Sequence, residues 1–317
     1  MKKKYVFVTV SLIDNLKQVN IAIRKFHKIY NLHRYIIITP YESTLHFKNA
    51  FFNFDYVEII DENKILNKKK FNDLCAKFLK SKTDYKLFRK NWYYQQLLKL
   101  TYTLNYKNFP DKRIIIWDAD TIPLKKIKFF NEEDDPILYG SKYEYHIPYF
   151  ECNNIIFGKK IIYPELSFVT QFAALNSWMR NDLKNVLVKY VKSSNMTLDK
   201  YYVAKAVLHS ISIKHDNEPI YGSHFSEYEF IGSFLLRTIN ESRKNQKKLK
   251  FFRNYVDGKL NLIQKMILYF FDYKHITYEN ENYLRKKQSY RKLFKNILLD
   301  NTYFLFEPLK KFFNKKN

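Results

Sequence analysis

The segment RIIIWDADTIPL, residues 113–124, places four apolar side chains directly before two aspartates that a single alanine separates. A short, continuous apolar run rich in β-branched residues is typical of a strand buried on both faces. Burying a carboxylate without a partner costs free energy, so a buried strand that ends in Asp118 and Asp120 indicates a place where negative charge is used. Because Thr121-Ile122-Pro123 favours a turn, we expect the two carboxylates to converge there.

The sequence before this strand predicts an α/β fold. Further buried strands are expected at YVFVTVSL (5–12), YIIITP (35–40) and YVEII (56–60), with a helical pattern of apolar residues between the first two. Residues 71–107 are expected to be helical. This order predicts a Rossmann-like, mostly parallel central sheet flanked by helices, in which ligands bind at the carboxyl ends of the strands.

Beyond residue 136 the pattern is mixed. PILYGSKYEYH (136–146) and ECNNIIFG (151–158) are expected to form strands or loops. Residues 164–191 are expected to form a long helical region that is broken once, and residues 197–210 another helix.

Composition limits the class of protein. With 317 residues and 46% hydrophobic content, the chain can bury a large core, which excludes a disordered protein. The formal net charge of +25 either reflects amino-acid usage alone or indicates an anionic partner such as nucleic acid, anionic lipid or a charged substrate. Cys75 and Cys152 lie far apart, which fits a reducing compartment. Since no apolar stretch approaches the ~18 residues that span a bilayer, we expect a cytoplasmic protein, soluble or peripheral on the inner face of the cytoplasmic membrane.

The two aspartates are suited to binding a divalent cation. Mn²⁺ and Mg²⁺ prefer hard oxygen ligands and substrate phosphates, so a metal that bridges to a diphosphate would offset both the repulsion and the burial of the two carboxylates. The alternative is that Asp118 or Asp120 only caps a turn or a helix.

Five motifs in a fixed order carry a resemblance to a known family: NWYYQQLLKL (91–100), IIIWDADTIPL (114–124), KYEYHIPYFE (142–151), SFVTQFAAL (167–175) and SEYEFIGSFLL (226–236). The sequence resembles GT-A-fold glycosyltransferases, and more specifically a bacterial family associated with surface-polysaccharide genes and recorded as a glycosyltransferase-like domain of unknown function. The resemblance spans about residues 5–240. It implies a nucleotide-sugar-binding and catalytic domain over residues 1–240, followed by a basic, aromatic, helical extension over 241–317.

The resemblance also implies roles for single residues. Asp120 would bind Mn²⁺ or Mg²⁺, and Asp118 would contact the metal or the donor ribose. The resemblance also places six residues near the nucleotide sugar: Thr9, Ser11, Trp92, Gln95, Gln96 and Lys99. Alternatives remain for this group, because Trp92 also suits the core and adjacent glutamines cannot face the same way on a helix.

Later motifs supply the remaining candidates. Glu227, and second to it Glu229, would be the catalytic base of an inverting transfer, although two exposed acids at a helix start are the alternative. His146 and Glu151 would line the acceptor side, and His224 would be a third metal ligand.

The C-terminal region interleaves lysine and arginine with aromatic residues. RKNQKKLKFFR (243–253) and LRKKQSYRKLFK (284–295) are expected to form basic amphipathic helices that lie on anionic lipid, or else a solvated helical subdomain.

Together these features predict a metal-dependent glycosyltransferase. It would move a sugar, most simply from a UDP-sugar, to a glycan or glycolipid acceptor in the synthesis of a bacterial surface polysaccharide such as lipopolysaccharide. Two alternatives are a nucleic-acid-binding protein that uses the basic and aromatic residues, and a catalytically inactive scaffold that retains the fold.

Overall fold

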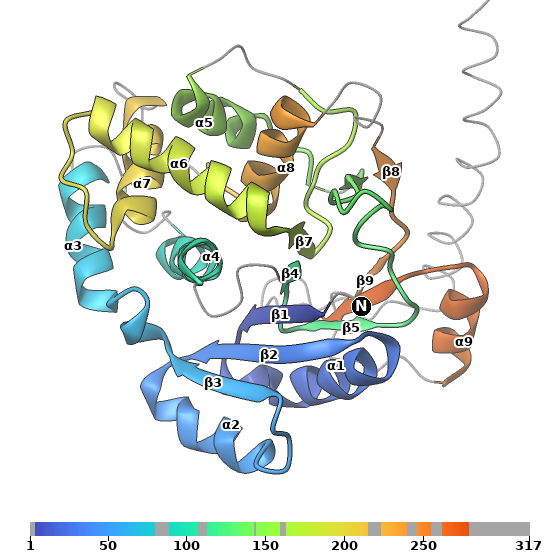
Figure 1. Ribbon diagram of the computed structural model, residues 1–317. Coiled ribbons are helices and arrows are strands. Elements are labelled where there is room, and N and C mark those ends of the chain that lie inside the picture. The colour runs from blue at the N-terminus through green and yellow to red at the C-terminus, as the bar shows by residue number, and fades with distance from the viewer. Residues whose placement is uncertain are drawn as a thin grey trace, which may run out of the picture. The chain divides into compact units, whose positions relative to one another are not determined.

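The computed structural model describes residues 4–79, 89–106, 113–142, 144–158, 163–214, 223–239, 246–254 and 262–278 (Figure 1). The chain divides into two compact units. The first contains Met1–Ala119 and Lys128–Lys248, and the second contains Asp120–Ile127 and Leu249–Asn317.

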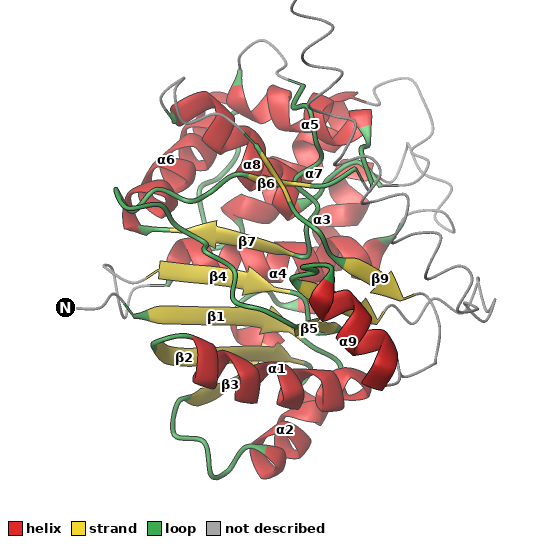
Figure 2. Cartoon of the chain, turned by 90° about the vertical axis from the view of Figure 1, so that its right-hand side faces the viewer, coloured by secondary structure: helices red, strands yellow, loops and turns green. Residues whose placement is uncertain are grey.

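A five-stranded sheet forms the centre of the first unit. Its strand order is β3-β2-β1-β4-β7 (Figure 2). The first four of these strands are parallel to one another, whereas β7 runs antiparallel to β4. The strands are β1 (Tyr5–Val10), β2 (Leu32–Thr39), β3 (Val57–Asp61), β4 (Arg113–Trp117) and β7 (Phe172–Leu175). The predicted α/β fold with a mostly parallel central sheet flanked by helices is confirmed.

The central strands β1 and β4 are buried on both faces, which explains why they are almost continuously apolar, whereas the edge strand β3 is partly exposed. Helix α4 (Lys90–Asn105) packs on one face, in a core that includes Val8 and Ile116. Helix α1 (Leu16–Ile29) covers the opposite face, where the Phe26 ring lies 4.0 Å from the ring of Phe7 and 4.8 Å from that of Trp117 (Figure 2). The strand RIIIW therefore crosses the middle of the core.

Most of the remaining helices join the α4 side of the core. The helices of this unit also include α2 (Thr44–Ala50), α3 (Lys68–Leu79), α5 (Ile147–Phe157), α6 (Ser177–Ser193), α7 (Tyr202–Lys214) and α8 (Glu227–Thr238). Three short 3₁₀ helices lie at Ile13–Asn15, Tyr41–Ser43 and Glu62–Lys64, and a short parallel pair is formed by β6 (Tyr139–Gly140) and β8 (Lys247–Lys248).

Two of the predicted elements differ from the structure. The expected helical region 164–191 contains strand β7, because Phe172–Leu175 pairs with β4 before Asn176 caps α6. The segment 151–158, expected to be strand or loop, belongs to helix α5. Pro148 in its first turn and Gly158, left-handed at φ 61°, are the start and stop residues typical of such a helix.

The second unit is built on a smaller sheet. Strand β10 (His275–Tyr278) pairs antiparallel with β5 (Thr121–Pro123) and parallel with β9 (Phe252–Asn254). Helix α9 (Leu262–Phe270) contributes Leu268 to the core of this unit. The predicted helix over 243–253 is wrong in its described part, since β8 and β9 lie there; residues 284–295 fall outside the described residues. None of the described helices is both long and apolar enough to cross a membrane.

Candidate functional site

The site is built around the Asp118 side chain, which follows β4 directly. Its backbone N–H donates to the carbonyl of Gln171 at 3.1 Å. Its Oδ1 atom accepts from the Lys99 ammonium at 2.5 Å and from the Tyr228 hydroxyl at 2.6 Å. Oδ2 makes no hydrogen bond with the described residues, and the side chain is 15% exposed. One oxygen of the carboxylate is thus fixed by the protein, while the other is open to a ligand.

Lys99 links Asp118 to a second carboxylate. The buried ammonium lies 2.6 Å from Oε1 of Glu227, which is only 1% exposed. Burial by itself lowers the pKa of Lys99, but Asp118 and Glu227 outweigh burial and raise this pKa above its usual range. Burial raises the pKa of Glu227, and Lys99 opposes that shift. One lysine therefore serves two carboxylates, and the three groups together carry a formal charge of −1.

One face of α4 holds the segment that contains Glu227. The Tyr93 hydroxyl accepts from the backbone N–H of His224 at 2.6 Å, and Gln96 Oε1 accepts from the N–H of Glu227 at 3.2 Å. Tyr93, Gln96 and Lys99 follow one another at intervals of three residues, which places them on the same face. The motifs NWYYQQLLKL and SEYEF are therefore in direct contact. Of the two adjacent glutamines, Gln96 makes this contact, while Gln95 is half-buried elsewhere on the helix.

Glu229 binds the loop of residues 167–171, which contacts Asp118 at its end. It is fully buried, and its Oε1 accepts from the Ser167 hydroxyl and, at 2.9 Å, from the N–H of Phe168. Burial raises the pKa of Glu229 to about 8 against the opposing effect of these hydrogen bonds. The loop ends at Gln171, which adopts φ 65° and accepts the Asp118 N–H through its carbonyl. Glu229 thus helps to fix the backbone at Asp118.

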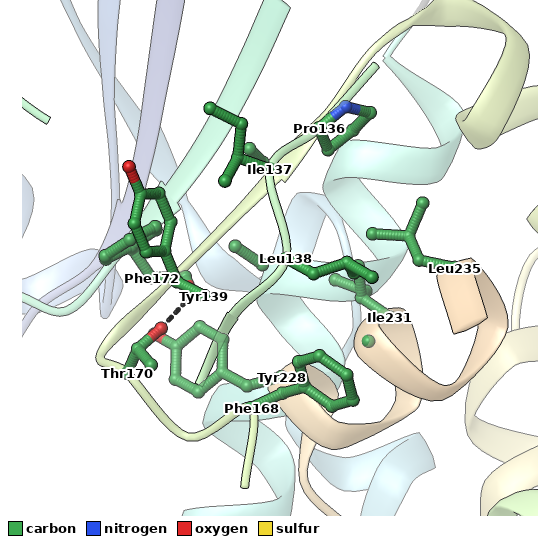
Figure 3. A pocket seen from close by; sticks show the side chains of 13 residues that line it. Pro136, Ile137, Leu138, Tyr139, Phe168, Thr170, Phe172, Tyr228, Ile231 and Leu235 are labelled. Carbon is green, nitrogen blue, oxygen red and sulfur yellow. Dashed lines mark hydrogen bonds between the residues drawn. The ribbon is translucent and has the colours of Figure 1, made fainter. Parts of the chain in front are cut away.

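Gly232 gives the same loop room to pack on α8. A Cβ atom at this position would lie only 2.1 Å from a ring carbon of Phe168, so the close approach requires glycine. Phe168 also lines an apolar pocket together with Leu138, Ile231 and Leu235 (Figure 3). The ring of Tyr228 lines this pocket too, while its hydroxyl bonds to Asp118.

Both glutamates begin α8, as the alternative from the sequence expected, but they are buried rather than exposed. Negative charge is favourable at a helix N-terminus, which suits this placement. A general base must reach the proton that it removes. In this arrangement the Glu227 carboxylate contacts Lys99, and the Glu229 carboxylate contacts the Ser167 loop.

Three other polar candidates from the sequence are also buried. Thr9 and Ser11 are buried at the end of β1, and the Thr39 hydroxyl donates to the Ser11 carbonyl at 2.8 Å. His224 is buried as well, and its backbone rather than its ring makes the bond to Tyr93. The site brings Lys99, Asp118 and Glu227 together. Thr9 and Ser11 instead contact β2, and His224 contacts α4 through its backbone.

The candidates for the acceptor side gather around α5. The rings of Trp92 and Tyr149 are stacked at 6.3 Å, and the His146 ring meets Tyr149 edge-on at 4.8 Å. Glu151 forms an ion pair with Lys214 at 3.2 Å. Trp92 and His146 therefore share one aromatic neighbour, whereas Glu151 has a separate ionic partner.

Asp120 belongs to the second unit. Its Oδ1 accepts from the Thr121 hydroxyl at 3.2 Å, and its backbone carbonyl accepts from the N–H of Tyr278 at 2.9 Å. Within the described ranges, no three His, Cys, Asp or Glu side chains are arranged to hold a metal ion. The open Oδ2 of Asp118 nevertheless fits a hard cation such as Mg²⁺ or Mn²⁺, which takes one or two carboxylates and fills its other positions with water and substrate phosphate.

Tyr228 was not among the residues singled out from the sequence. It is one of 27 tyrosines and no periodic pattern distinguishes it, but its position between two acids in SEYE could have drawn attention. The sequence assigns no role at Asp118 to Gln171 either, because the backbone of Gln171 rather than its side chain makes the contact.

Comparisons with solved structures find glycosyltransferases. Mouse xyloside xylosyltransferase 1 aligns at 12% identity over 90% of this chain and 100% of its own, with a TM-score of 0.42. The galactosyltransferase LgtC, in complex with donor and acceptor sugar analogs, aligns at 10% identity over 93% and 95%, with a TM-score of 0.43. The glycosyltransferase GlyE of Streptococcus pneumoniae aligns at 10% identity over 98% of this chain and 64% of its own, with a TM-score of 0.32.

A family model matches less than half of the chain. No curated protein shows a significant match to the sequence. Residues 11–151, which include α4, β4 and Asp118, match the model of a family described as "Family of unknown function (DUF6492)". The resemblance to a domain family of unknown function that the sequence motifs indicate is confirmed over these residues.

Proposed function

We propose that this protein is a metal-dependent glycosyltransferase that moves a sugar from a nucleotide sugar to a glycan or lipid-linked acceptor. The proposal is based on the position and the hydrogen bonds of the Asp118 carboxylate. This carboxylate lies at the carboxyl end of a central strand, where α/β sheets bind ligands, and two protein donors hold one of its oxygens while the other has no described partner.

Asp118 and Asp120 would hold the metal, Mn²⁺ or Mg²⁺. A bound divalent cation would neutralise the negative charge that develops on the departing nucleotide diphosphate. Lys99 and Tyr228 keep the Asp118 carboxylate in one orientation, so that it does not have to be ordered when the donor binds. Gln171 does the same for the backbone of Asp118.

Glu227 is proposed here as a positioning residue. The sequence names it as the base of an inverting transfer, but its carboxylate is enclosed and paired with Lys99. Its charge balances the Lys99 ammonium, which allows the ammonium to stay buried beside Asp118. Inversion remains a prediction from the family resemblance, and the anomeric configuration of the product, read by NMR, would test it.

The substrates follow from the sequence resemblance. A UDP-sugar is the proposed donor, with the nucleotide near the end of β1, where Thr9 and Ser11 lie. The proposed acceptor is an intermediate of bacterial surface-polysaccharide synthesis. His146 and Glu151 are proposed for the acceptor side, and Trp92 for the donor. The contact of His146 with the Tyr149 ring supports the acceptor side, because aromatic faces suit sugar rings.

A thermal-shift screen tests the proposal. We expect UDP-, GDP- or CMP-sugars to raise the melting temperature in the presence of Mn²⁺ but not with EDTA, because metal and diphosphate bind together. Asp118→Asn should abolish the shift. Glu132→Gln, which alters a surface carboxylate, should retain it. Stabilisation by oligonucleotides alone would instead favour nucleic-acid binding, and no response to any nucleotide sugar would favour an inactive scaffold.

A further inference from the structure

Helix α9 presents apolar side chains on two faces. One face, with Ile267 and Leu268, packs against the core of the second unit. The other face is exposed: Leu262 is 74% and Phe270 82% exposed, and Ile263, Met266 and Tyr269 are exposed as well. At 100° per residue these five side chains share one side of the helix. A helix that is apolar on both sides is typical of one that is buried or that lies in a membrane interface.

The charges around this exposed face are positive. Lys265 is exposed on α9 itself, and the Lys125 ammonium lies 4.4 Å from the centre of the Tyr269 ring. Asp272, the acid that follows the helix, is already paired with Lys125 at 3.0 Å and Lys274 at 2.8 Å. The described residues of the second unit contain six lysines and arginines against two aspartates. The face therefore combines aliphatic side chains with an excess of positive charge.

We propose that this face of α9 binds the surface of an anionic lipid bilayer. Leu262, Ile263, Met266 and Phe270 would enter the interface, with Tyr269 at its polar boundary, while the surrounding lysines contact the anionic headgroups. A second copy of the chain is a poorer partner, because it would bring like charges together. Nucleic acid is a poorer partner too, because three of the five side chains, Leu262, Ile263 and Met266, offer no stacking surface to bases.

The inference deepens the proposed function, since it would bring the enzyme to a lipid-linked acceptor. The biological role of lipid binding rests on the proposed function, but lipid binding itself is measured without nucleotide sugar. Loss of vesicle binding would leave the thermal-shift result untouched, and absence of a thermal shift would leave vesicle binding untouched.

Flotation of the full chain with vesicles tests the inference. We expect the protein to float with vesicles of phosphatidylcholine mixed with phosphatidylglycerol, and less with phosphatidylcholine alone. Ile263→Gln/Phe270→Gln should reduce binding to the anionic vesicles about tenfold or more, because two apolar side chains no longer leave water. Lys265→Gln should reduce binding to a smaller extent. High salt should remove the contribution of Lys265 to the binding of the wild type, because salt screens charge interactions.

A matched control comes from α2 and the turn after it in the first unit. Leu45 and Phe52 are also exposed, so Leu45→Gln/Phe52→Gln removes a similar apolar area. This variant should float like the wild type, and circular dichroism should show that both double variants are folded. Equal flotation of the wild type and the α9 variant would overturn the inference. So would an equal loss in both double variants, or a change in sedimentation that shows α9 to be a contact between copies of the chain.

Discussion

At the scale of single residues, Lys99 determines the geometry around Asp118. Its ammonium is shared between Asp118 and Glu227, and none of the three side chains is well solvated. A buried ion pair adds little stability compared with an apolar pair, but breaking one leaves an uncompensated charge. Removing one partner should therefore destabilise the protein more than the intact ion pair stabilises it.

Lys99→Met should destabilise the protein by about 3–5 kcal/mol, because Glu227 would remain buried without its cation. Lys99→Met/Glu227→Gln should recover part of this loss, since the second change removes the stranded charge. Urea unfolding of the wild type, both single variants and the double variant measures the coupling. Strictly additive losses would show that the pair is not coupled. Lys128→Met, at a surface pair with Glu132, should cost less than about 1 kcal/mol.

Glu229 should make stability depend on pH. Its pKa in the folded protein is about 8, above the ordinary value of 4.5, so between these values the folded state holds a proton that the unfolded state has released. This contribution is fully present below pH 4.5 and declines as pH rises towards 8, by at most about 1.4 kcal/mol per pH unit.

Glu229→Gln should flatten this part of the pH profile, because glutamine can accept from Ser167 and Phe168 without ionising. Unfolding free energies of the wild type and the variant between pH 5 and 8 provide the measurement. Glu132→Gln serves as the surface control and should leave the slope unchanged. A variant with the slope of the wild type would show that Glu229 is ionised in the folded state.

At the scale of elements, the contact between α8 and the Ser167 loop supports the site. Gly232→Ala would place a methyl group where the Phe168 ring lies, and should cost about 1–3 kcal/mol. Phe168→Leu in the same chain should relieve part of that cost by removing ring atoms. Denaturant unfolding would show a loss smaller than the sum of the two single variants. If Gly232→Ala alone has no effect, the loop is not packed as closely as described.

Sequence reasoning succeeded where one local pattern decides the element. The run IIIW in 114–117 is short, continuous and rich in β-branched residues, which favours a buried strand, and the same holds for β1 and β2. It failed at FAAL (172–175), because alanine favours helices and only pairing with β4 makes this segment a strand. Tertiary pairing of this kind leaves little trace in a single sequence.

The candidate site was likewise only partly predictable. Asp118, Lys99 and Glu227 are charged residues inside apolar runs, and this contrast marks them in the sequence. Their joint contact depends on how α4 and α8 pack, which no local pattern specifies. For the same reason the sequence does not show that Glu227 is buried and paired with Lys99.

At the scale of the whole molecule, the site and the chain as a whole carry charges of opposite sign. The chain carries a formal charge of +25, yet Asp118, Glu227 and Lys99 together carry −1. A positive protein attracts a nucleotide diphosphate from a distance but repels a free dication. We therefore expect the metal to bind most tightly together with the nucleotide.

Electron paramagnetic resonance of free Mn²⁺ tests this expectation most directly. When the wild type is titrated with Mn²⁺, the signal of free Mn²⁺ should fall as the protein binds the metal. The binding should be tighter when UDP is present. Asp118→Asn should weaken this binding about tenfold or more, because a charged ligand becomes neutral. Glu132→Gln should bind like the wild type. Equal Mn²⁺ binding by the wild type and Asp118→Asn would contradict the assignment of Asp118 as a ligand of a metal–nucleotide site.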